Sequence, residues 1–156
     1  FYLGVEVTDD VFHQVNGEDQ MWAGDSIQIL IAFDKNSSSG TQYCIGLADG
    51  KNPSIHRYFQ EANTTGYFGL GANAAFLDGE QGITCSQNKT YYEVKIPWDK
   101  IRYGGGKPER GDMLYFSALV NDSDGEGRRL WMEYGLSNIG AGYSSPAKAM
   151  RMLLDE

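Results

Sequence analysis

Hydrophobic and polar residues alternate with a period of two along much of this chain. Such alternation is typical of strands that bury one face. It predicts eight strands, which cover residues 1–8, 26–33, 41–48, 54–60, 91–98, 114–121, 129–134 and 147–154. A helical turn is expected at residues 97–101, and no segment longer than ten residues has a helical period.

Clusters of Gly, Asn, Asp and Ser separate these segments, at 36–40, 49–53, 104–106 and 122–127. Short strands at a spacing of ~8–12 residues, joined by turn residues, indicate an antiparallel sandwich or barrel. We therefore expect an all-β chain, an antiparallel β-sandwich of jelly-roll or immunoglobulin-like type, in one domain over residues 1–156. Because Phe1 already lies inside a strand pattern, we expect this domain to be a fragment of a larger protein.

Composition narrows the classes of function. The formal net charge of −8, from 13 basic and 21 acidic side chains, argues against nucleic acid as a partner, because a phosphate backbone requires a basic face. No apolar run approaches the ~20 residues of a membrane helix. The chain also lacks a nucleophile elbow, a zinc-protease motif and a phosphate loop, so we expect no enzymatic activity.

The cysteines and histidines leave two alternatives open. Cys44 and Cys85 do not have the spacing of a zinc site, and they are either two buried thiols or one disulfide. A haem-binding electron-transfer domain is a less favoured alternative, in which His13 or His56 would pair with Met21 or Met132 as axial ligands.

The three tryptophans have different surroundings. Trp98 lies on the apolar side of its strand pattern and is expected in the core. Trp22 precedes a strand, in a loop, and Trp131 shares the polar side of its strand with Arg129 and Glu133. An aromatic ring beside polar groups suits a sugar, whose C–H face stacks on the ring while its hydroxyls form hydrogen bonds. Packing under a loop is the alternative for both Trp22 and Trp131.

Acidic residues follow two of the predicted strands. Asp122 and Asp124 lie in the turn after residues 114–121, and Asp9 and Asp10 follow the first strand. Ca²⁺ prefers several oxygen ligands from flexible turns, so these four residues are candidate ligands of a structural calcium ion. A solvated acidic turn is the alternative. An EF-hand is excluded because no helix flanks the turn.

Several runs resemble the family 9 carbohydrate-binding modules. The strongest is Met21–Ile29, which contains Trp-x-Gly-Asp-Ser-Ile-Gln, and Tyr92–Trp98 and Gly127–Arg129 support it through their order and spacing. The resemblance covers nearly the whole chain, except that the opening strand or strands of the family are missing before Phe1. It implies a β-sandwich, often with bound Ca²⁺, that is attached to secreted enzymes that degrade glycans.

The resemblance also implies where a sugar binds. In this family two aromatic rings sandwich a sugar at a chain end, and Trp22 and Tyr143 look like these two residues. Gln28 matches the position of a glutamate that binds hydroxyls. Cys44 stands where an arginine is expected, and Arg57 on the neighbouring strand is a candidate replacement.

We therefore predict a non-catalytic, extracellular module that holds an attached enzyme or cell-surface protein on a polysaccharide or oligosaccharide. Its other partners would be further domains of the same polypeptide. The predicted carbohydrate-binding residues are Trp22, Gln28, Tyr143, Trp131 and Arg57. The alternative is a sandwich that has lost its sugar and packs Trp22 or Tyr143 against another domain, which the departures at Cys44 and Gln28 favour.

Overall fold

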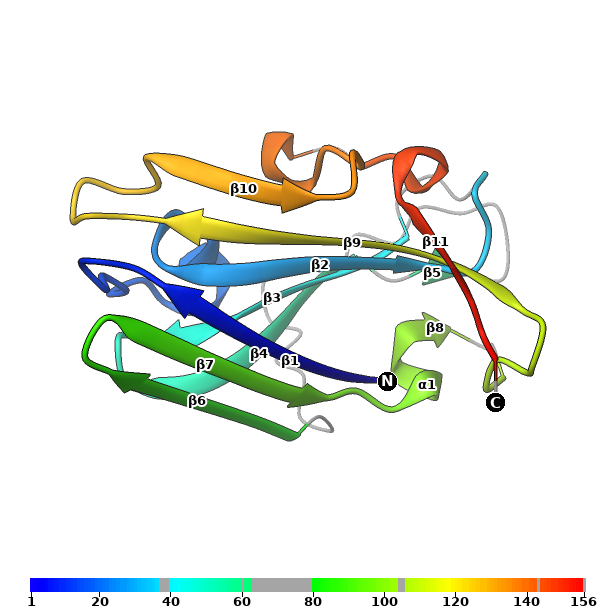
Figure 1. Ribbon diagram of the computed structural model, residues 1–156, viewed down its shortest axis with the longest axis horizontal. Helices are drawn as coiled ribbons and strands as arrows, with labels where there is room; N and C mark the ends of the chain where they lie inside the picture. The colour runs from blue at the N-terminus through cyan, green and yellow to red at the C-terminus, as the bar shows by residue number, and fades with distance from the viewer. Residues whose placement is uncertain (37–39, 60, 63–79, 104–105, 143, 156) are drawn as a thin grey trace.

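The computed structural model describes residues 1–36, 40–59, 61–62, 80–103, 106–142 and 144–155. Strands dominate it (Figure 1). The strands are β1 (Tyr2–Thr8), β2 (Ser26–Ala32), β3 (Thr41–Ala48), β4 (Asn52–Phe59), β5 (Glu61–Ala62), β6 (Glu80–Ser86), β7 (Lys89–Lys95), β8 (Arg102–Tyr103), β9 (Met113–Asp122), β10 (Leu130–Tyr134) and β11 (Met150–Leu153). The helical segments are η1 (Glu18–Ala23), α1 (Trp98–Ile101), η2 (Ile139–Ala141) and η3 (Pro146–Lys148).

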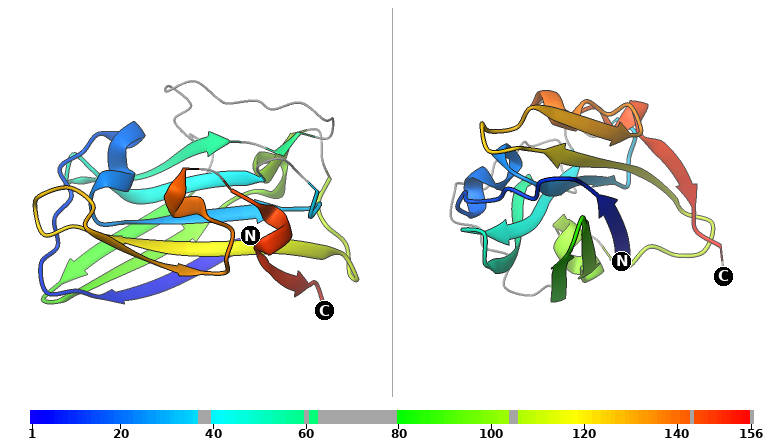
Figure 2. Two further views of the ribbon diagram at one scale, coloured as in Figure 1. Left: turned by 90° about the horizontal axis from the view of Figure 1, so that it is seen from above. Right: turned by 60° about the vertical axis from the view of Figure 1, so that its left-hand side comes forward.

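Two antiparallel sheets form the layers of a sandwich (Figure 2). The larger sheet has six strands in the order β10-β9-β2-β3-β4, with β11 also paired to β9, and the smaller has the order β1-β7-β6. β5 and β8 form a separate parallel pair. This architecture confirms the predicted all-β antiparallel sandwich. In the part of the chain that the structure describes, no helix is long and apolar enough to cross a membrane.

The core lies between the two sheets. Ile27, Ile29 and Ile31 of β2 point inward and pack with Tyr92 and Val94 of β7, as their alternation predicted. Burial of each such side chain contributes about 1.5–3 kcal/mol. The outer face of β2 is covered as well, because its even-numbered positions are also buried. Short helical segments and loops provide this cover, and the candidate site lies among them.

Trp98 packs on the core, as predicted, but it lies in a short helix and not in a strand. Strand β7 ends at Lys95, and Trp98 begins the short helix α1 instead of continuing the strand. Pro97 precedes it, and proline cannot donate a ladder hydrogen bond. The Trp98 ring nevertheless packs on the core and makes edge contacts with Phe1 and Phe33, at 6.1 and 6.2 Å between ring centroids.

The predicted strands all have counterparts, but three strands were missed: the two-residue strands β5 and β8, and the longer strand β6. Its sequence alternates Gln81, Ile83 and Cys85 with Gly and polar residues, so it lacks the apolar period that marks a half-buried strand. β6 pairs only with β7 and lies at the edge of the smaller sheet. Cys85 on this strand is exposed, whereas Cys44 on β3 is buried, and both thiols are free. The disulfide alternative is therefore excluded, and the alternative of two buried thiols is correct for Cys44 but wrong for Cys85.

β10 extends beyond the smaller sheet. It forms one edge of the larger sheet, and β6 lies near β4 at the opposite side, with Gln81 donating to the carbonyl of Pro53 at 3.0 Å. The smaller sheet ends at β1, so Leu130 and Met132 of β10 border an open pocket beside β1 and do not pack on a further strand among the described residues. Leu130, Met132 and Tyr134 are 66%, 73% and 61% exposed in consequence. Alternation predicted which face they share but not that this face is uncovered.

Candidate functional site

A pocket of about 380 Å³ opens on the outer face of the larger sheet. Its floor is formed by β2, β3 and β4, and its walls come from η1, the β9–β10 loop and η2. The described residues that line it are Trp22, Gln28, Gln42, Tyr58, Phe59, Arg128 and the segment 139–142. Two residues predicted from the sequence, Trp22 and Gln28, thus meet in one pocket.

Trp22 lies on η1, which crosses one end of the larger sheet. Its ring packs against a small cluster around Met21 and Cys44, so one part of it is held while another part faces the pocket. Gln14 restrains this segment through hydrogen bonds to its backbone. Its side-chain amide donates to the carbonyl oxygens of Met21 at 2.8 Å and Asp25 at 3.1 Å, and it is only 3% exposed. The Trp22 ring is therefore presented on a restrained segment.

Gln28 projects from the middle of β2 into the pocket. Its side chain is 7% exposed, and its Oε1 atom has no hydrogen-bond partner among the described residues. A buried amide oxygen without a partner costs about 1–3 kcal/mol, so its presence requires an explanation. A bound ligand that donates a hydrogen bond to Oε1 would remove this cost. Gln28 therefore marks where a polar ligand is expected.

Arg128 reaches the same pocket from the β9–β10 loop. Its guanidinium carbon lies 5.0 Å from the ring centroid of Trp22 and 4.7 Å from that of Trp131. Its Nη1 donates to Asn121 Oδ1 at 3.1 Å, and its Nη2 donates to the carbonyl oxygen of Gly140 at 2.8 Å. Burial lowers the pKa of this guanidinium, but it stays charged at neutral pH because the ordinary pKa of arginine lies far above neutrality.

Sequence reasoning missed Arg128 as a site residue, although the Gly127–Arg129 run was part of the family resemblance. The signal in the sequence was that Cys44 stands where an arginine is expected. This departure led to the choice of Arg57 as the replacement, and not of Arg128. Arg128 lies near enough to Cys44 that its charge lowers the pKa of that thiol, against a larger increase caused by burial. Arg128 thus places a guanidinium near Cys44, the position on β3 where an arginine was expected.

Arg57 is not in this pocket, which corrects the prediction that it replaces the missing arginine. It is paired with Tyr43 across β3 and β4, and Tyr43 belongs to the core between the sheets. Side chains of directly paired residues share one face, so Arg57 points to the inner side of the larger sheet. There its Nη1 donates to the carbonyl oxygen of Lys100 at 3.1 Å.

The other two predicted sugar-binding residues have different outcomes. Trp131 lies on the outer face of β10, as its parity predicted, but the described lining of this pocket does not include it. Its ring contacts Arg128 instead and is 49% exposed. Tyr143 lies outside the described residues. Its neighbour Gly142 lines the pocket, and Ser144 Oγ accepts a hydrogen bond from Gln42 at 2.5 Å.

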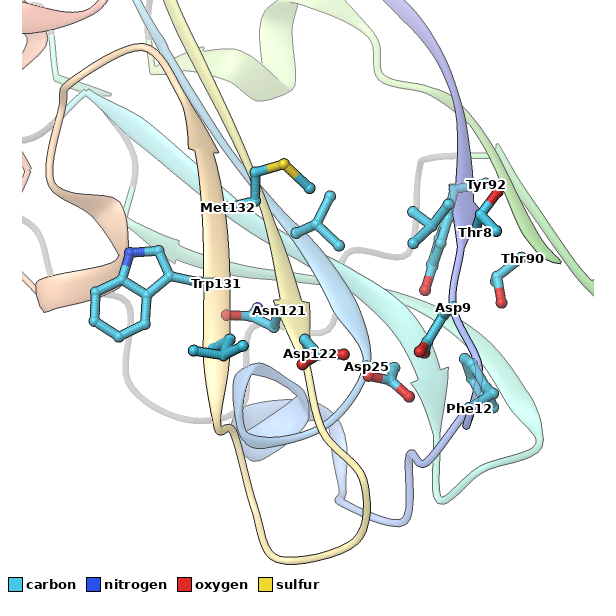
Figure 3. Close-up of a pocket in the computed structure, with 13 residues that line it drawn as sticks. Thr8, Asp9, Phe12, Asp25, Thr90, Tyr92, Asn121, Asp122, Trp131 and Met132 are labelled. Atoms are coloured by element: carbon cyan, nitrogen blue, oxygen red, sulfur yellow. The ribbon is translucent and has the colours of Figure 1, made fainter. Parts of the chain in front are cut away.

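A second pocket, of about 280 Å³, opens between the sheets beside β1 and β10 (Figure 3). Its walls are mainly apolar, and Asp9, Asp25 and Asp122 lie close together at one end. Trp131 also lines it, but its indole ring points away (Figure 3). Met132 points into it. The pocket is therefore distinct from the one beside Trp22, although both border the β9–β10 region.

Three of the four predicted metal ligands gather at this acidic end. Carboxylate oxygens of Asp9, Asp122 and Asp124 all lie within 4.8 Å of one another, and Asp10 is not part of the group. Burial, followed by the negative charges of Asp9 and Asp124, raises the pKa of Asp122. Three carboxylates, one after β1, one at the end of β9 and one in the loop that follows β9, form an oxygen-only donor set, and such a set fits Ca²⁺.

Asp25 ties these turns together. Its carboxylate accepts hydrogen bonds from the backbone N–H of His13 and from that of Ser123, the latter at 2.8 Å. Burial raises the pKa of Asp25 to about 7, and the charges of Asp9 and Asp122 act in the same direction. The residue is thus a structural link between the segment before η1 and the start of the β9–β10 loop.

The haem alternative gains no support from these residues. An axial ligand must face a pocket that admits the macrocycle. Met21 and His56 are 0% and 2% exposed, and the described linings of the two pockets include neither. Met132 lines the pocket beside Asp122, but no histidine is among the described residues that line it.

Comparison with known proteins decides the family. The family model described as "Carbohydrate family 9 binding domain-like" matches residues 1–155. This chain belongs to that family. As a member of this family, the domain is a non-catalytic carbohydrate-binding module. A search of curated proteins found no match.

Two solved structures resemble this family 9 domain. Both are family 9 carbohydrate-binding modules from Caldicellulosiruptor kristjanssonii, one described in complex with cellotriose and the other with glucose. Each has a TM-score of 0.68 and 17% sequence identity, over 99% of this chain. The matches cover 68% and 70% of those two chains. At this identity the likeness supports the fold of this domain.

Proposed function

We propose that this family 9 domain binds a sugar in the pocket beside Trp22 and does not cleave it. The observation that carries the proposal is the buried Oε1 atom of Gln28, which has no hydrogen-bond partner among the described residues and belongs to the pocket lined by Trp22 and Arg128. A sugar supplies what this arrangement lacks, because its hydroxyls donate to an amide oxygen while its C–H face stacks on an indole ring. The two solved relatives described with cellotriose and glucose agree with this proposal.

Calorimetry with oligosaccharides tests the site. We expect Trp22→Ala to weaken binding roughly 30-fold, which corresponds to about 2 kcal/mol for a central aromatic contact. The matched control is Tyr2→Ala, because Tyr2 is an aromatic residue of β1 that is 76% exposed and lies outside the pocket. Equal affinities of wild type and Trp22→Ala would remove the proposed site.

The alternative of a purely structural sandwich makes a different prediction. It requires the Trp22 side of the larger sheet to be covered by another domain, and it predicts no sugar affinity. The pocket of about 380 Å³ beside Trp22 favours binding instead. A full-length polypeptide that protects Trp22 from a fluorescence quencher, in the absence of sugar, would support the structural alternative.

We further propose that Ca²⁺ binds among Asp9, Asp122 and Asp124. The support is the proximity of their oxygens, from turns that the chain brings together at one end of the sandwich. An ion at about 100 times its Kd would stabilise the fold by roughly 2.7 kcal/mol. We expect CaCl₂ to raise the melting temperature of wild type and to have little effect on Asp122→Asn. Asp99→Asn, at an exposed residue of α1, is the control.

The wider role that we propose is the attachment of a larger secreted polypeptide to a polysaccharide outside the cell. A non-catalytic module with one sugar pocket contributes to an enzyme by raising its effective concentration at the substrate. The test is a pull-down of the full-length polypeptide on insoluble polysaccharide. Wild type should sediment with the polysaccharide, and Trp22→Ala should remain in solution.

A further inference from the structure

The sugar pocket has a charge opposite to that of the whole domain. Among the described residues that line it, Arg128 is the only one with a formal charge at neutral pH. The remaining polar side chains, including Gln28 and Gln42, are neutral. The domain as a whole carries −8. A guanidinium in a pocket whose described walls carry no carboxylate is therefore a local departure from the negative charge of the domain.

Among the described residues, no carboxylate accepts a hydrogen bond from Arg128. Its two protein acceptors are the neutral oxygens of Asn121 and Gly140. A guanidinium has five N–H donors, so these two bonds leave three for a ligand. The rings of Trp22 and Trp131 lie at 5.0 and 4.7 Å and restrict its orientation, which reduces the entropy lost on binding.

A chain of hydrogen bonds that begins at Asn121 supports this orientation of Arg128. Asn121 is 1% exposed, and its Oδ1 accepts the hydrogen bond from Arg128. The Nδ2 of Asn121 donates to Ser26 Oγ at 3.0 Å. Ser26 Oγ in turn donates to backbone oxygens of the η1 region. Arg128 is thus placed by a chain of neutral hydrogen bonds that leads back to the segment carrying Trp22. Its charge is left to be matched by a ligand.

We propose that this pocket selects an acidic sugar, whose carboxylate or sulfate ester is bound by Arg128 while its ring lies beside Trp22 and Gln28. A planar guanidinium binds such anionic oxygens with paired, charge-assisted hydrogen bonds, which are about twice as strong as neutral ones. A neutral sugar would leave the charge of Arg128 without a counter-charge. The inference rests on the proposed sugar-binding function and adds the class of sugar.

Calorimetry at ~0.15 M salt, where distant charges are screened beyond about 8 Å, compares acidic and neutral sugars of one shape. The probes are glucuronate and glucose 6-sulfate, each against glucose. We expect at least one acidic probe to bind roughly 10-fold or more tightly than glucose, and the stronger of the two identifies the anionic group. Glucose binding that equals or exceeds both would overturn the inference and leave sugar binding intact.

Variants assign the preference to Arg128. We expect Arg128→Gln to lower the affinity for the acidic probe roughly 10-fold more than the affinity for glucose, and Arg128→Lys to keep part of the preference. Gln28→Glu adds a carboxylate at nearly constant volume and should reverse the preference while the fold stays intact. Arg110→Gln is the control, because Arg110 is exposed and pairs with Asp155 outside the pocket. An unchanged preference in both Arg128→Gln and Gln28→Glu would contradict the proposal.

The same measurements distinguish failure of the proposed sugar binding from failure of the proposed selectivity. If wild type binds neither acidic nor neutral sugars, the proposed function itself fails. If it binds both equally, only the selectivity fails. Circular dichroism of each variant, with its melting temperature, shows whether a loss of binding reflects unfolding of the loop around Arg128.

Discussion

The contact between Gly140 and Trp131 allows a sharp test of how the sugar pocket is built. A Cβ atom on residue 140 would lie 2.6 Å from Trp131 Nε1 and 2.8 Å from Leu119 Cδ1. Both distances are shorter than real Cβ contacts. Leu119 is fully buried, whereas Trp131 is half exposed, so the indole is the group that should move. Its movement would remove one of the two rings beside Arg128.

We expect Gly140→Ala to destabilise the domain by about 1–3 kcal/mol, the usual cost of overpacking. For a domain of this size this corresponds to a melting temperature roughly 2–12 °C lower. Differential scanning calorimetry measures the change. Gly82→Ala on β6 is the matched control, because a Cβ there meets nothing within 4 Å. A melting temperature for Gly140→Ala equal to that of wild type would show that the loop has room, and the packing argument would be wrong.

Two further predictions concern the supports of the pocket. Gln14→Ala removes two hydrogen bonds to backbone oxygens under η1, and we expect it to cost about 1–3 kcal/mol in urea unfolding and to weaken sugar binding severalfold, because Trp22 loses its restraint. Removal of Ca²⁺ with EGTA should lower the melting temperature and also weaken sugar binding in calorimetry. The reason is that Asp122 at the proposed ion site and Asn121 beneath Arg128 are consecutive residues of β9.

The sequence predicted the strands well where one or both faces are buried. Alternation identified β2, whose inward residues form the core, and it placed Gln28 on the opposite face. It failed for β6, an edge strand with few apolar residues. It also could not indicate that the inner face of β10 is uncovered, because alternation reports which residues share a face and not what lies opposite.

The site was predictable only in part, for a related reason. Trp22 and Gln28 come from one continuous run, so spacing alone brings them near each other. Arg128 comes from a loop about a hundred residues later, and only the pairing of β2 with β9 places it there. Arg57 was chosen because its strand neighbours Cys44, but the pairing of β3 with β4 turns it inward. Which face a replacement side chain occupies depends on register, which the sequence did not specify.

The uncovered inner face of β10 also affects how the purified domain should behave in solution. Leu130, Met132 and Tyr134 form an exposed apolar row on a strand whose other edge has no partner strand among the described residues. Such an edge can add a strand from another molecule, and natural proteins commonly block this with a charge. We expect association of the isolated domain to increase with concentration in light scattering. Met132→Lys should suppress it without altering the sugar pocket.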